Sequence, residues 1–312
     1  MRSLRSPATC LIFAACLGAC GKSKAPPEPA KPASAAVALP AETRTVIGVD
    51  VAKVAASPLA VRALRALLDA DPDTRARVDS LLARCKIDLA ADLKSVTIGM
   101  GGPDDVAMVI AGRIDENTLV GCIREAVPVE QRGRTYVATA KDGRIVYFAF
   151  GGEPTLILAT NAAWLGKIVD PAAAKLGGAT AERLAKVGPR AAVWGVGELP
   201  AGVGQKLVEL AKGEIAAPAQ SVAFEVELDG GGGMSASLGA DMASAADADK
   251  LAVLVKSELG WAAVFAQRWG LGRLVAKADV RTDQRGVRVS LKLDDKELAE
   301  VAAVLDGKEH KR

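Results

Sequence analysis

Apolar residues recur along the first half of the chain with two different periods. Two apolar runs around a glycine-rich turn, SVTIGMGGPDDVAMVIAGRID (95–115), predict a β-hairpin. The stripe Leu119, Cys122, Ile123 and Ala126 follows at helical spacing and predicts a helix. Around these elements the pattern predicts the strands TVIGVDV (45–51), TYVATAKDGRIVYFAFG (135–151) and LILAT (156–160), and the helices SPLAVRALRALL (57–68) and NAAWLGKIV (161–169).

The second half repeats this pattern. Its hairpin, SVAFEVELDGGGGMSASLGAD (221–241), also opens Ser-Val, breaks at glycines and places an Asp twenty residues after the Ser. The helical stripe that follows is Ala248, Leu251, Ala252 and Val255. The remaining predicted elements are the strands AAVWGVGEL (191–199) and LVAKADVRTDQRGVRVSLKL (274–293) and the helices GQKLVELAKG (204–213) and DKELAEVAAVL (295–305).

Each half therefore has the element order β-α-β-β-α-β, which is the order of a split βαβ unit. We predict an α+β fold of two tandem ferredoxin-like units, with antiparallel sheets and helices on one face of each. The first repeat covers residues 45–190 and the second covers 191–306. The first has an additional helix, for which Asp71 is the predicted N-cap and Pro72 the first helical residue.

The N-terminal residues differ in composition from this body. Residues 1–19 hold a positive start at Arg2 and Arg5 and then the uncharged run ATCLIFAACLGA (8–19), which is typical of a signal peptide. Residues 20–44 are rich in proline and alanine and predict an extended tether. A GKS tripeptide at 21–23 is no phosphate-binding loop, because Cys16 stands where that loop needs glycine.

The tetrapeptide Leu17-Gly18-Ala19-Cys20 resembles the lipobox of a bacterial lipoprotein precursor. The resemblance implies cleavage before Cys20, which then carries the lipid and would take up a palmitate label. More than one acyl chain is needed for stable membrane anchoring. Because Gly21 and not aspartate follows the cysteine, the family rule implies the outer membrane, facing the periplasm. The body also resembles uncharacterised secreted lipoproteins with duplicated ferredoxin-like units.

Charge excludes one class of partner. Loss of residues 1–19 removes Arg2 and Arg5, which lowers the formal net charge of +3 by two, to +1. A nearly neutral chain has no electrostatic footprint for nucleic acid. Residues 307–312 form a short basic tail that holds His310, the only histidine of the chain.

After removal of the predicted signal peptide, the chain keeps two cysteines besides Cys20. These are Cys85 and Cys122, each on the apolar stripe of a predicted helix. In a split βαβ unit the two helices lie side by side, so a disulfide is sterically feasible in an oxidising compartment. Two separate buried thiols explain the same pattern, since buried cysteine packs as a small hydrophobe. Both interpretations remain open.

Catalytic and metal-binding chemistry has little support in the sequence. A body without histidine cannot build a Ser-His-Asp triad and offers no imidazole ligand for zinc. Asp69, Asp71 and Asp73 alternate as in a calcium loop, but Thr74 stands where such a loop needs glycine. The sequence predicts that the protein is not an enzyme and has no cofactor and no metal.

An aromatic ridge in the second repeat has two interpretations. Trp261, Phe265 and Trp269 lie at i, i+4 and i+8 in a chain that is only 4% aromatic. Most such ridges are core, because burying aromatic rings is strongly stabilising. The alternative is a surface that lines a ligand groove or contacts a partner or a bilayer. Exposure of Trp261 and Trp269 discriminates between them.

Two functions fit these features. The first is a non-catalytic, lipid-anchored cell-envelope lipoprotein that acts as a protein-binding or structural module, held to the membrane through Cys20 and able to contact an envelope protein. The alternative is a carrier or sensor of a small apolar ligand held between the two repeats.

Overall fold

The computed structural model describes residues 38–305 apart from 70, 103, 141, 152–154, 200–204, 206–207, 210–214, 218 and 230–231. The predicted signal peptide, Cys20, most of the tether, most of the helix 204–213 and the basic tail lie outside these residues. The chain divides into two compact units. Unit 1 contains Met1–Thr43 and Gly48–Leu176, and unit 2 contains Arg44–Ile47 and Gly177–Arg312. Twelve strands and ten α-helices are described, a mixed α/β architecture with a large amount of antiparallel sheet.

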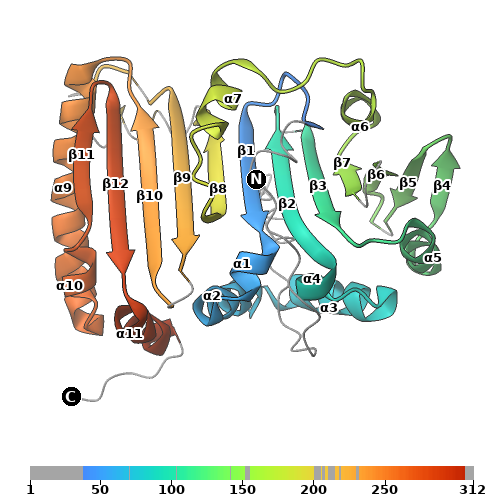
Figure 1. Cartoon of the computed structure of the whole chain (residues 1–312), viewed down its shortest axis with the longest axis horizontal. Helices are drawn as coiled ribbons and strands as arrows, with labels where there is room; N and C mark the ends of the chain where they lie inside the picture. The colour runs from blue at the N-terminus through green and yellow to red at the C-terminus, as the bar shows by residue number, and fades with distance from the viewer. Residues whose placement is uncertain are drawn as a thin grey trace. The chain divides into compact units, whose positions relative to one another are not determined.

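Unit 1 has the strand order β2-β3-β7-β6-β5-β4, and every neighbouring pair is antiparallel. Helix α6 packs on β3, β6 and β7, and α5 contacts α3 (Figure 1). The core includes Val96, Ile110 and Phe148, each almost fully buried. The elements are β1 (Thr45–Asp50, divided between the two units), α1 (Val51–Ala55), α2 (Pro58–Asp69), α3 (Pro72–Cys85), α4 (Leu89–Asp92), β2 (Leu93–Met100), β3 (Val106–Gly112), α5 (Glu116–Ala126), β4 (Val129–Arg132), β5 (Thr135–Thr139), β6 (Ile145–Phe150), β7 (Thr155–Ala159) and α6 (Ala162–Val169).

Unit 2 has the strand order β11-β12-β10-β9-β8, again with antiparallel neighbours. The long helix α9 runs along β11 and β12 on one face of this sheet (Figure 1). The elements are α7 (Gly178–Leu184), β8 (Ala191–Gly197), β9 (Ser221–Leu228), β10 (Met234–Asp241), α9 (Ala245–Ala266), the 3-10 helix η3 (Gln267–Trp269), α10 (Gly272–Val275), β11 (Asp279–Asp283), β12 (Gly286–Leu293) and α11 (Asp295–Leu305).

The strand order corrects part of the predicted topology. In unit 2, β12 lies between β10 and β11, so the connection through α9 is a split β-α-β crossover. A ferredoxin-like unit needs a second such crossover, whereas β8 and β9 are direct antiparallel neighbours. The mixed α and β composition with antiparallel strands is as predicted, but the ferredoxin-like arrangement is not confirmed. The order of elements along a chain does not specify which strands pair.

Close packing at Gly195 fits the observed β8–β9 register. Gly195 lies opposite Phe224, and a Cβ atom at Gly195 would come within 2.3 Å of the Phe224 ring. A larger residue at position 195 would therefore collide with that ring. The glycines of Gly195-Val-Gly197 serve strand packing inside β8.

Candidate interaction surface on helix α9

Helix α9 begins at a well-defined cap. The Ser244 hydroxyl oxygen accepts a hydrogen bond from the Asp247 backbone N–H, at 3.1 Å, and donates its own hydrogen to the Asp247 carboxylate, at 2.8 Å. The Ala216 N–H also donates to that carboxylate, at 3.0 Å. These bonds lower the pKa of Asp247, the bond from Ala216 contributing most and the bond from Ser244 next. The start of α9 is fixed by side-chain capping.

The first half of α9 faces the core of unit 2. Ala248, Leu251 and Ala252 of the predicted stripe are buried. They form one cluster with Val280 of β11 and Val287 of β12. This half of α9 therefore behaves as the 3.6-residue pattern predicts for a helix that packs on a sheet.

The second half of α9 carries large apolar side chains on its outside. Trp261 is 61% exposed, Phe265 is 60% exposed and Trp269, in η3, is 51% exposed. Val264 lies among them and is 57% exposed. The ridge is not core in this structure, and the interpretation as a surface is the one that its exposure supports. We call Trp261, Val264, Phe265, Arg268 and Trp269 together the aromatic face.

Arg268 supplies the charge of the aromatic face. Its guanidinium carbon lies 3.9 Å from the centroid of a Trp269 ring and 5.9 Å from the centroid of the Phe265 ring. Both contacts are cation–π contacts. No Asp or Glu forms an ion pair with Arg268 within the part of the chain that the structure describes. Among the described residues, the face therefore presents exposed rings together with a cation that forms no ion pair.

The chain turns sharply after the aromatic face. Gly270 has φ +73°, in the left-handed region that glycine adopts without strain, and its N–H bonds back to the Gln267 carbonyl. Helix α10 then returns beside α9, where a Cβ at Gly272 would lie 2.6 Å from the Ala263 carbonyl oxygen. Leu274 of α10 is buried. The end of α9 is thus held by packing.

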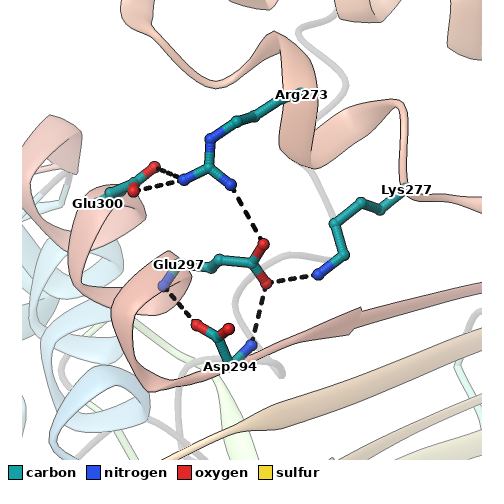
Figure 2. A network of polar contacts seen from close by, with 5 residues as sticks. All are labelled: Arg273, Lys277, Asp294, Glu297 and Glu300. Carbon is teal, nitrogen blue, oxygen red and sulfur yellow. Dashed lines mark hydrogen bonds and ion pairs between the residues drawn. The ribbon is translucent and has the colours of Figure 1, made fainter.

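A polar network ties the segment after α9 to α11 (Figure 2). Asp294 and Glu297 exchange backbone-to-carboxylate hydrogen bonds of 2.9 and 3.1 Å, a reciprocal capping box at the start of α11. Glu297 also accepts from Lys277, at 2.6 Å, and from Arg273, at 3.2 Å, while Arg273 pairs with Glu300. The hydrogen bond from Lys277 is the largest cause of the lowered pKa of Glu297, followed by the bond from the Asp294 N–H.

The two cysteines of the body are bonded to each other. A disulfide joins Cys85, at the end of α3, to Cys122 in α5, with a Cα–Cα distance of 5.3 Å. Both residues are buried. The bond links two helices of unit 1 and belongs to the packing of that unit.

Other chemistry is sparse in the described residues. Across residues 38–305, less the gaps given above, no group of three or more His, Cys, Asp or Glu side chains is placed to hold a metal ion. A hollow of about 230 Å³ lies on α2 and α3. Its lining is formed by Asp69, Pro72, Arg75, Ala76 and Asp79.

Sequence reasoning missed two members of the aromatic face and the network that supports it. Val264 and Arg268 lie on the same side of the helix as the predicted ridge, so helical spacing could have added them. The pattern Asp-x-x-Glu at 294–297 is a readable capping signal. The contacts of Glu297 with Arg273 and Lys277 join residues at least 20 positions apart, and no local pattern indicates them.

Comparison with known proteins identifies the fold alone. No protein-family model matches the chain, and no curated protein matches it. Among solved structures, crystal form I of TP0453 is similar, with a TM-score of 0.51 and 9% sequence identity. The similarity covers 90% of this chain and 99% of that one. In the residues that the structure describes, no helix is both long enough and apolar enough to cross a membrane.

Proposed function

We propose that the protein is a non-catalytic, lipid-anchored protein of the cell envelope that acts by contact through the aromatic face of α9. The exposure of Trp261, Phe265 and Trp269 is the observation that carries this proposal. Two of the four tryptophans of the chain are more than half exposed to solvent in this structure. Exposed aromatic clusters of this kind mark interaction sites.

The composition of the aromatic face also suits a binding surface. Trp, Phe and Arg are enriched where proteins bind other molecules, and Trp and Arg supply much of the binding free energy at such places. The face stands on a supported helix end, because Gly270 turns the chain and Leu274 is buried behind it. A supported surface loses little conformational entropy when it binds.

The anchoring part of the proposal rests on the lipobox at Leu17-Gly18-Ala19-Cys20. We expect Cys20 to carry the lipid and the mature protein to lie on the outer membrane, facing the periplasm. Metabolic labelling with palmitate tests this directly. The label should be present on the natural chain and absent from Cys20→Ala, which should move to the soluble fraction. Membrane retention of an unlabelled Cys20→Ala chain would contradict the anchor.

The alternative, a carrier of an apolar ligand between the repeats, gains no comparable support. The hollow on α2 and α3 lies within unit 1, and Asp69, Arg75 and Asp79 line it together with Pro72 and Ala76. It therefore gives no support to a ligand site between the repeats. We therefore retain the contact function as the one that the described residues favour.

Photo-crosslinking in intact cells tests the contact function. A photoreactive amino acid at position 261 should form adducts with another envelope component on irradiation. The control is the same amino acid at Ile145 of β6, which is 46% exposed and lies in unit 1. Adducts at position 261 that exceed those at position 145 support the proposal. Equal yields at both positions would show that α9 is not a specific contact surface.

A further inference from the structure

Part of the aromatic face points away from the core of unit 2. Leu251 and Ala252 define the buried side of α9. At 100° per residue, Val264 and Arg268 project away from Leu251 and Trp261 from the flank of the helix, whereas Phe265 lies within about 40° of Leu251 and is nevertheless 60% exposed. The face is thus a convex ridge along a helix surface. A broad, deformable surface can cover such a ridge, and Trp in particular is enriched at the boundary between membrane and water.

The charges of this stretch favour an anionic surface. From Val253 to Trp269 the charged residues are Lys256, Glu258 and Arg268, a net charge of +1. Arg268 lies within the face, and a guanidinium pairs well with phosphate oxygens. A phospholipid head group places phosphate next to apolar chains, so one kind of surface satisfies both Arg268 and the rings around it. A protein partner would instead have to desolvate a carboxylate to reach Arg268.

The predicted tether allows the aromatic face to reach the membrane. The predicted tether ends earlier than residue 44, because Leu39, Pro40 and Thr43 are buried in the fold. Residues 21–37 then separate the lipid on Cys20 from the folded body and, at about 3 Å per residue, would extend up to about 50 Å. Attachment at Cys20 turns a second membrane contact into an intramolecular event at high effective concentration. A face of three rings and one valine then suffices, although it would bind a bilayer only weakly on its own.

We propose that the aromatic face of α9 lies on the anionic surface of the bilayer that carries the lipid anchor, with its rings between head groups and its Arg268 at lipid phosphates. This inference rests on the proposed anchoring and contact function, and it names the occupant of the same face. The protein would then be held at two points, at Cys20 and at α9, so that unit 2 lies against the membrane.

Intrinsic tryptophan fluorescence tests this placement. Trp164 and Trp194 are 3% and 2% exposed, so quenchers reach mainly Trp261 and Trp269. The lipidated full chain is reconstituted in vesicles of phosphatidylethanolamine and phosphatidylglycerol with or without brominated acyl chains. We expect brominated lipid to remove most of the Trp261 and Trp269 emission and acrylamide in the water to quench little of it. The variant Trp261→Phe, Trp269→Phe should lose the brominated-lipid effect.

The arginine is tested with a matched pair of variants. Arg268→Gln should weaken the lipid quenching most clearly in vesicles that contain phosphatidylglycerol, and less where phosphatidylcholine replaces it, whereas Arg288→Gln, at an exposed position of β12, should leave the quenching unchanged. Equal quenching in both variants would overturn the role of Arg268. Each variant is first checked for an unchanged thermal melt.

The outcomes separate this inference from the proposed function. Unchanged emission with brominated lipid, together with full acrylamide quenching, would overturn the membrane contact. If position 261 then crosslinks to a protein in cells, the contact function stands with a protein as its occupant. If position 261 crosslinks to nothing beyond the control, the contact function fails as well.

Discussion

Helices α5 and α9 each follow the second strand of a hairpin, β3 and β10, but they are used differently. Both begin at a side-chain cap, Asp115 and Ser244, and both bury an apolar stripe in their first three turns. Helix α5 ends after 11 residues, whereas α9 runs for 22. The exposed residues of α5 are polar or small, among them Glu116, Arg124 and Gly121. Only α9 continues past its core contact with large apolar side chains facing outward.

This difference indicates that the exposed aromatic side chains in the second half of α9 are not required by the packing of its unit. A helix that serves only the core can end where its buried stripe ends, as α5 does. Helix α5 is also covalently fixed, because Cys122 is bonded to Cys85. Exposed aromatic rings add little burial, so a contact outside the fold explains them better than stability does.

The largest expected effect on stability comes from the disulfide that holds α5. Loss of the disulfide in Cys85→Ser, Cys122→Ser removes a cross-link between residues separated by 37 positions, which the chain-entropy model values at about 4 kcal/mol. Thermal and urea unfolding should show the loss in unit 1. Reduced natural protein should match the double variant apart from packing losses. If the unfolded natural protein titrates as two free thiols at Cys85 and Cys122, the bond does not form in solution.

The next largest effect on stability is expected in the first half of α9, which buries an apolar stripe as α5 does. Leu251 is 5% exposed and packs with Val280 and Val287. Leu251→Ala should lower the free energy of unfolding by about 2–5 kcal/mol, because it leaves a cavity in the core of unit 2. Urea unfolding measures the loss. Val253→Ala, two residues away and 69% exposed, is the control and should change little. Equal losses at both positions would contradict the division of α9 into a core side and a free side.

The strands and helices could largely be predicted from the sequence, because their apolar periods are local. The hairpins at 95–115 and 221–241 are β2–β3 and β9–β10, and the stripe from Ala248 to Val255 lies in α9. Strand pairing could not be predicted in the same way. The β8–β9 pair depends on a glycine opposite Phe224, a contact between residues far apart in the chain.

The candidate site could be located from the sequence but not interpreted. An apolar stripe at helical spacing has the same appearance whether a sheet covers it or water does. Trp261 and Leu251 both belong to such stripes, yet Trp261 is 61% exposed and Leu251 only 5%. The disulfide remained open for a similar reason, since helix proximity is a property of the tertiary structure.

A smaller loss of stability is expected from removing the side-chain cap with which both α5 and α9 begin. Ser244→Ala and Asp115→Ala each remove the side-chain acceptor that caps a helix, and each should cost about 1 kcal/mol. Urea unfolding of the two variants makes the comparison directly. Similar losses would show that α5 and α9 start in equivalent ways and differ only in how they end. A much larger loss for Ser244→Ala would indicate that Asp247, which also binds the Ala216 N–H, depends on the cap.

Acid should weaken the polar network between the segment after α9 and α11, whereas the disulfide of α5 does not titrate. The pKa of Glu297 in the folded protein is below its ordinary value of 4.5, mainly because Lys277 donates a hydrogen bond to it. A lowered folded-state pKa stabilises the fold at pH values above the unfolded-state pKa, and this contribution is lost as the pH falls through the folded-state pKa. The stability of the natural protein should therefore fall more steeply than that of Glu297→Gln below about pH 4.5. Urea midpoints measured across this range check the difference, and parallel curves would contradict it.

The smallest effect on stability is expected where the effect on function is largest. Phe265→Ser and Trp261→Ser change side chains that are 60% and 61% exposed, so each should alter the free energy of unfolding by less than about 0.5 kcal/mol. Trp164→Ser, at a buried position of α6, is the matched aromatic control and should be strongly destabilising. Phe265→Ser should lose the crosslinks formed by the photoreactive amino acid at position 261, and both Phe265→Ser and Trp261→Ser should weaken the quenching by brominated lipid. A loss of stability comparable to that of Trp164→Ser would show that the aromatic face is part of the fold, and the difference between α5 and α9 would then be one of length alone.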